Sequence, residues 1–173
     1  FHLYEGDISA LTTVHNAFPD KNVYFTEQWT GAKGTFAEDL MWHIKNVVIG
    51  SMNNWSKNAL EWNLANDEFF GPHTPGGCTE CKGALTIKRN GEIQRNVAYY
   101  IIAHASKFVP AGSVRIGTGT VPDLDVTAFR TPEGKTVLVV LNSTDTDKIF
   151  VISHQRKEVP VTMKSKSVAT FVF

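Results

Sequence analysis

The stretch Asn22-Val23-Tyr24-Phe25-Thr26-Glu27 is a short apolar run that ends in a carboxylate. Its β-branched and aromatic residues predict a buried strand. A helical pattern precedes this strand; Asp7 can cap that helix and Pro19 ends it. Residues 1–4 form an earlier strand-like run. The chain therefore opens with the order strand, helix, strand.

The same alternation continues after the stretch. Thr35 and Glu38 have the spacing of a capping box, ahead of an amphipathic helix that we expect Gly50 to end. Residues 59–62 read as a third strand, and a long loop rich in glycine and proline follows. Asn96 can cap a last helix. Three strands alternating with helices predict a parallel sheet covered by helices, which is an α/β fold.

From Ser113 onward the pattern contains strands only. The expected strands cover residues 113–117, 125–130, 136–142, 148–154, 159–163 and 167–173. Thr131-Pro132-Glu133-Gly134 is the clearest turn between them. Short strands at this even spacing predict an antiparallel β-sandwich.

The composition excludes several classes of function. Of 173 residues, 42% are hydrophobic, and 17 basic side chains balance 17 acidic ones. The absence of a basic stripe argues against a nucleic-acid partner. No apolar run approaches the roughly 18 residues that a membrane-spanning helix needs. Because the chain starts at Phe1, inside a strand-like run, we expect it to be part of a longer protein whose signal peptide lies outside this sequence.

Glu27 is the leading candidate for chemistry. It follows a buried strand directly, and ligands of parallel α/β folds gather at the carboxyl ends of the strands. Trp29 lies two residues further on, and a carboxylate beside an aromatic ring suits sugar chemistry. The alternative is a glutamate that only stabilises the start of the next helix.

Polar and aromatic residues also lie on the neighbouring strands. Trp62 and Asn63 end the third strand, while His2 and Tyr4 alternate on the first and so share a face. If the three strands meet at one edge, all four residues lie near Glu27. Taken singly, each could instead be an ordinary core residue.

Cys78 and Cys81 are the only cysteines, in a Cys-x-x-Cys pattern within the glycine-rich loop. They fit either a local disulfide or two free thiols. A structural zinc site needs four ligands, usually from two such pairs, so we expect no metal even with His73 nearby. No cofactor is expected either.

Several of these segments resemble glycoside hydrolase family 30, the family of glucosylceramidases, endo-β-1,6-glucanases and related β-glycosidases. The resemblance rests on residues 1–4, 25–27, 61–65, 106–116, 123–129 and 137–142, and it covers nearly the whole chain in order. It implies that residues 1–112 are the last three βα units of a (β/α)8 TIM barrel. Residues 113–173 would then be its β-sandwich side domain.

The resemblance also implies roles for the site residues. Glu27 matches the catalytic nucleophile, and Tyr4 and His2 match positions beside it. Trp62 and Asn63 match the wall of the sugar subsite, and Trp29 is a further candidate substrate-binding residue. The family's acid/base glutamate lies in an Asn-Glu-Pro context that this sequence lacks. We therefore expect this chain alone to be inactive and to need the other part of the barrel, or self-association.

The function implied is a secreted, retaining β-glycosidase that acts on β-1,6-glucan or a related β-glucoside. Glucosylceramidase-type and β-xylosidase-type exo-hydrolases remain alternatives. So do an inverting hydrolase and a noncatalytic carbohydrate-binding fragment.

Overall fold

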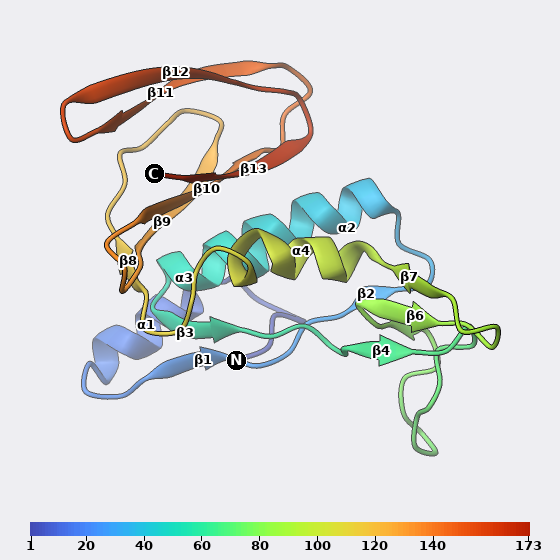
Figure 1. The fold of residues 1–173 in the computed structure, drawn as a ribbon. Helices are drawn as coiled ribbons and strands as arrows, with labels where there is room; N and C mark the ends of the chain where they lie inside the picture. The colour runs from blue at the N-terminus through green and yellow to red at the C-terminus, as the bar shows by residue number, and fades with distance from the viewer. The chain divides into compact units, whose positions relative to one another are not determined.

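A computed structural model describes all residues, 1–173, which form two compact units, Phe1–Ala103 and His104–Phe173 (Figure 1). The first unit contains all the predicted site residues. The second consists almost entirely of strands. None of the helices has the length and hydrophobicity needed to cross a bilayer.

Three segments of the first unit run parallel to one another, as predicted. β1 (Val23–Phe25) pairs with β3 (Ser56–Ala59) in parallel, and Phe25 is fully buried. Two isolated parallel bridges, His2 to Glu27 and Trp29 to Trp62, extend this pairing. Three chain segments therefore lie side by side with their carboxyl ends at one edge.

The bounds of the outer two segments differ from the prediction. Residues 1–4 form only the bridge at His2 and no full strand. β3 begins at Ser56, earlier than expected, because the Ser56 hydroxyl accepts the Phe25 N–H at 2.9 Å and donates to Asn58 O at 2.6 Å. These polar residues do not show the alternating pattern by which a strand is recognised.

The first two helices begin in different ways. α1 (Ala10–Ala17) starts after Ser9, and Asp7 accepts the Ser9 N–H at 2.8 Å in the turn before it. The capping box of α2 (Phe36–His43) is confirmed, because the Thr35 hydroxyl accepts the Glu38 N–H at 3.2 Å.

The prediction that Gly50 ends the second helix is wrong. The helix continues as a π-helical segment, η1 (Ile44–Gly50), and then as α3 (Ser51–Asn53). A Cβ on Gly50 would lie 2.9 Å from the Lys45 carbonyl oxygen. Glycine is therefore required by close packing within the widened turn and does not act as a stop signal.

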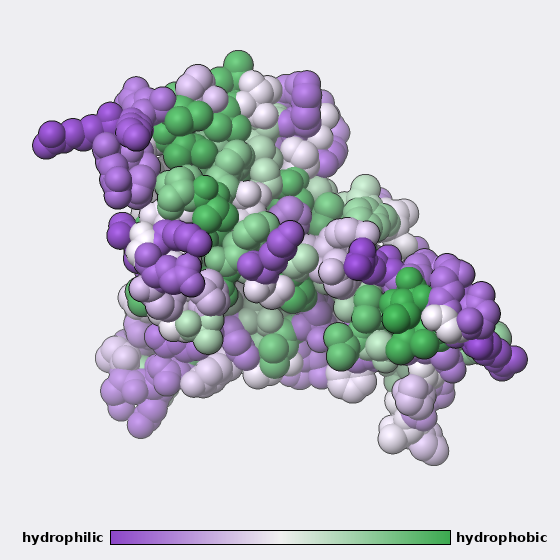
Figure 2. Space-filling view, viewed as in Figure 1, coloured by the Kyte–Doolittle hydropathy of each residue, from purple (hydrophilic) through white to green (hydrophobic).

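The segment predicted as a long loop contains four short strands. They are β4 (Ala65–Asn66), β5 (Cys81–Lys82), β6 (Leu85–Ile87) and β7 (Ile93–Arg95). β5 pairs antiparallel with β2 (Thr30–Gly31), and β6 pairs with both β4 and β7. Figure 2 shows hydrophobic residues gathered over β6 and β7, where Ile87 and Ile93 are exposed.

The last predicted helix is present as α4 (Val97–Ser106). Asn96 precedes it, but its side-chain amide donates to Gly83 O and to the Thr86 hydroxyl, both at 2.8 Å. Asn96 thus ties the start of the helix to the segment around β6.

The second unit is the predicted antiparallel sandwich. A four-stranded sheet has the order β13-β10-β9-β8, and β11 and β12 form a separate hairpin. The bounds are β8 (Val114–Ile116), β9 (Asp125–Arg130), β10 (Thr136–Asn142), β11 (Lys148–His154), β12 (Lys157–Met163) and β13 (Ser167–Val172). Leu124, Val140, Phe150 and Met163 form the core that joins the two layers.

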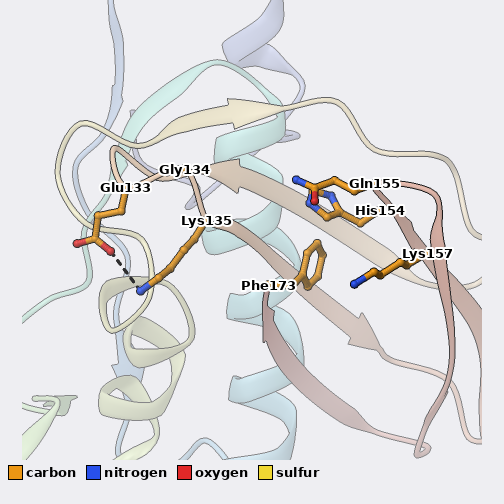
Figure 3. A pocket seen from close by; sticks show the side chains of 7 residues that line it. All are labelled: Glu133, Gly134, Lys135, His154, Gln155, Lys157 and Phe173. Atoms are coloured by element: carbon orange, nitrogen blue, oxygen red, sulfur yellow. Dashed lines mark ion pairs between the residues drawn. The ribbon is translucent and has the colours of Figure 1, made fainter.

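The predicted turn after β9 is also confirmed. Gly134 donates its N–H to Thr131 O at 2.9 Å and has a φ of 83°, which favours glycine. This turn borders a hollow of about 360 Å³, where the rings of His154 and Phe173 lie 4.8 Å apart (Figure 3). The lysines around the hollow are accompanied by Glu133, so both signs of charge are present.

Candidate functional site

The Glu27 carboxylate lies just beyond β1, where two side chains of the neighbouring segment reach it. Tyr4 Oη donates a hydrogen bond to Glu27 Oε1 at 2.5 Å, and His2 Nδ1 lies 3.6 Å from the same oxygen. The bridge between His2 and Glu27 places these groups together. The Glu27 side chain keeps 31% of its surface exposed, so a ligand can reach it.

Tyr4 is held in its protonated form. Burial, the hydrogen bond to Glu27 and the negative charges of Glu27 and Glu61 raise the pKa of Tyr4 to about 12. At neutral pH the phenol therefore remains a hydrogen-bond donor to the carboxylate.

The carboxylate opens into a cleft of about 520 Å³, a size typical of small-ligand sites. Trp29, Trp62 and Asn63 line it beside Tyr4 and Glu27, and the opposite wall comes from residues between Phe70 and Cys81. The cleft therefore combines one accessible carboxylate with aromatic surfaces. This combination suits the binding of a sugar ring.

The two tryptophans are positioned by the backbone. Trp29 and Trp62 form a parallel bridge, and a Cβ on Gly31 would lie 3.0 Å from the Trp29 ring, which packs over it. Trp62 is 46% exposed. Asn63 follows through a cis peptide bond, and its buried side-chain oxygen has no hydrogen-bond partner in the chain.

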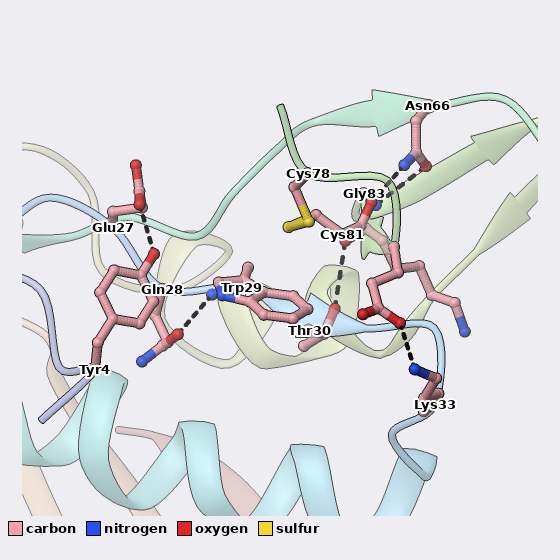
Figure 4. Close-up of a disulfide and its surroundings, with 12 residues drawn as sticks. Tyr4, Glu27, Gln28, Trp29, Thr30, Lys33, Asn66, Cys78, Cys81 and Gly83 are labelled. Carbon is pink, nitrogen blue, oxygen red and sulfur yellow. Dashed lines mark hydrogen bonds and ion pairs between the residues drawn. A yellow bond between two sulfur atoms is a disulfide. The ribbon is translucent and has the colours of Figure 1, made fainter. Parts of the chain in front are cut away.

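Cys78 and Cys81 are joined by a disulfide in the wall of the cleft. Cys81 begins β5, whose partner β2 directly follows Trp29. Figure 4 shows Trp29 between Glu27 and this disulfide. The described residues contain no group of three or more His, Cys, Asp or Glu side chains that could hold a metal ion.

Two features of the site escaped the sequence analysis. Gln28 is 6% exposed although it follows Glu27 directly. His43 Nδ1 lies 2.6 Å from Glu61 Oε1, and both side chains are almost fully buried. Nothing in the sequence spacing of His43 and Glu61 indicates that they pair.

Comparison with known proteins finds relatives that are named as glucanases and glucosylceramidases. Residues 112–171 match the glycosyl hydrolase family 30 beta sandwich domain. The chain is 31% identical to an endo-1,6-beta-D-glucanase of Trichoderma harzianum, covering 99% of this chain and 36% of that protein. It is 30% identical to a putative glucosylceramidase of Caenorhabditis elegans, and the match covers 82% of this chain and 29% of that protein.

A solved structure of the endo-beta1,6-glucanase BT3312 superimposes on the chain with a TM-score of 0.91. The two are 35% identical, and the match covers 99% of this chain and 39% of that one. The chain thus spans little more than a third of the length of such relatives. The β-sandwich, the order of the segments and these similarities agree, and the chain belongs to glycoside hydrolase family 30.

Proposed function

We propose that this chain forms part of a retaining β-glycosidase that hydrolyses β-1,6-glucan or a related β-glucoside, with Glu27 as the nucleophile. The observation that carries the proposal is the Glu27 carboxylate, held by Tyr4 at 2.5 Å in a cleft walled by Trp29 and Trp62. The β-1,6 linkage is supported by the names of the relatives, among which endo-1,6-glucanases recur.

The proposal includes the rest of a barrel. Residues 1–112 would be the last three βα units of a (β/α)8 barrel, and residues 113–173 its side domain. The parallel pairing of three segments supports this arrangement. Because three βα units cannot close a barrel, the remaining strands would come from the rest of the protein. Other barrel strands would cover the edges of the 1–4 and β3 segments.

The proposed reaction is a double displacement. With Oε1 held by Tyr4, Glu27 Oε2 attacks the anomeric carbon and forms a glycosyl–enzyme ester, while an acid outside this chain protonates the leaving oxygen. Water then cleaves the ester. His2, whose Nδ1 lies 3.6 Å from Glu27 Oε1, would help to orient the carboxylate. Trp29, Trp62 and Asn63 would contact the sugar.

A 2-deoxy-2-fluoro-β-glucoside with a good leaving group tests this assignment, because it slows hydrolysis of the ester. We expect peptide mapping of the protein with its complete barrel to find the label on Glu27. A label on any other residue would overturn the assignment. A first-formed product of inverted configuration would also exclude the retaining mechanism.

A glucosylceramidase-type activity is the second candidate, since relatives in Caenorhabditis elegans carry that name. Release of glucose from glucosylceramide without cleavage of β-1,6-glucan would favour it. Secretion is part of the proposal and is supported by the Cys78–Cys81 disulfide, which is typical of oxidising compartments.

Replacing Tyr4 with phenylalanine is expected to lower kcat by about 10- to 100-fold, because a hydrogen bond to a charged group contributes roughly 1.5–3 kcal/mol. The substitution removes only the hydroxyl that contacts Glu27. Steady-state kinetics on β-1,6-glucan would measure the loss. Tyr24→Phe, at an exposed position on β1, is the matched control and should change kcat little.

A further inference from the structure

The Gln28 side chain is buried, although Gln28 lies between two residues that line the cleft. It is 6% exposed, between the accessible Glu27 and the cleft-lining Trp29. Figure 4 shows the hydrogen bond between its amide and the Trp29 backbone. A buried amide has to satisfy both its donor and its acceptor to offset the loss of water.

Both ends of this amide are bonded. Nε2 donates to Leu3 O at 2.7 Å, and Leu3 lies between His2 and Tyr4, the two residues that contact the Glu27 carboxylate. Oε1 accepts the Trp29 N–H at 3.0 Å. One partner is an acceptor and the other a donor, so only one orientation of the amide satisfies both.

The backbone of Gln28 makes the third connection. Its carbonyl oxygen accepts the Trp62 N–H at 2.6 Å. One residue therefore joins the segment of His2 and Tyr4, the segment of Glu27 and Trp29, and the segment of Trp62. The Gln28 side chain makes the bonds to Leu3 and Trp29, and its backbone makes the bond to Trp62. A substitution of Gln28 therefore removes only the first two.

We infer that Gln28 is a positioning residue that holds Tyr4 and Trp29 in register with the Glu27 carboxylate. The inference rests on the proposed function. Gln28 does not line the cleft, so it acts through its neighbours and not on the sugar. Because misplacement of reacting groups by about 1 Å can cost about 100-fold in rate, loss of these links slows attack by Glu27.

Two variants of similar size separate the bonds from the packing. In Gln28→Met neither bond forms. Gln28→Glu keeps the bond from the Trp29 N–H, and it loses the bond to Leu3 O at a pH where the new carboxyl group is ionised, which is where it is assayed. Gln94→Glu, at an exposed position on β7, is the control for the added charge. Thermal unfolding gives the folded fraction, by which each rate is corrected.

The test is the rate at which the 2-fluoro glucoside labels Glu27 in the protein with its complete barrel. We expect both variants to be labelled about 10- to 100-fold more slowly than the natural protein, while the concentration for half-maximal labelling changes by less than about threefold. A purely structural role would reduce the folded fraction and leave the corrected rate unchanged.

The outcomes distinguish the two proposals. If the natural protein is labelled at Glu27 and the variants are labelled at the same corrected rate as the natural protein, the role of Gln28 is overturned and the proposed function stands. Natural protein labelled at a residue other than Glu27 overturns the proposed function, and the positioning role with it. Should Gln28→Glu fail to fold, Gln28→Met decides.

Discussion

Glu27→Gly is expected to lower the hydrolysis of β-1,6-glucan by at least about 10⁴-fold, because the variant has no group that can form the glycosyl–enzyme ester. The fold should survive the change. Glu27 lies beyond the end of β1, and its side chain is 31% exposed, so its removal leaves no cavity in the core. Kinetics on the protein with its complete barrel measures the loss.

Azide offers a sharper readout of the same variant. The small anion can occupy the space left by the carboxylate and attack the anomeric carbon of a β-glucoside that has a good leaving group. We expect partial recovery of leaving-group release and formation of an α-glycosyl azide. Glu27→Gln, which keeps the shape of the side chain, should be inactive and gain little from azide.

Glu5→Gln is the matched control, since Glu5 is an exposed carboxylate next to Tyr4 in the sequence. It should keep activity within about twofold of the natural protein, as surface changes usually do. Equal losses at Glu5 and Glu27 would indicate a general effect of charge at the cleft. Glu27→Gly with nearly full activity would remove the nucleophile assignment.

The buried pair of His43 and Glu61 should dominate the stability of the first unit. His43→Leu is expected to reduce the free energy of unfolding by about 3–5 kcal/mol, because it leaves the Glu61 carboxylate buried without a partner. Glu61 Oε2 is already buried without a hydrogen bond. Urea unfolding followed by tryptophan fluorescence would measure the change.

The double variant His43→Leu with Glu61→Leu tests the reason for this loss. With both polar groups gone there is no charge to desolvate, so much of the lost stability should return. Lys33→Ala, which breaks the exposed ion pair with Glu80, is the control and should cost less than about 1 kcal/mol. A His43→Leu variant as stable as Lys33→Ala would contradict the argument.

The pair also bears on the site, because Glu61 directly precedes Trp62 and its negative charge contributes to the raised pKa of Tyr4. His43→Leu should therefore lower activity at the cleft as well as the stability of the core. Correcting activity for the folded fraction separates the two effects.

The sequence predicted most reliably the elements with a strong local pattern. In β9, β10 and β11 the predicted and observed bounds agree. Each of these strands is at least six residues long and is flanked by turn residues, so its pattern is clear. The capping box of Thr35 and Glu38 is equally local. The strands β4 to β7 were missed because runs of two or three residues are too short to show a period.

By itself, then, the sequence determined the parallel α/β segment, the antiparallel sandwich and the position of Glu27 after a buried strand, since these depend on neighbouring residues. The tertiary structure alone decided what surrounds that carboxylate. Tyr4 lies 23 residues from Glu27, and His43 lies 18 from Glu61. Hydrogen bonds between such distant residues depend on how segments pack in space, and no local pattern of side chains records them.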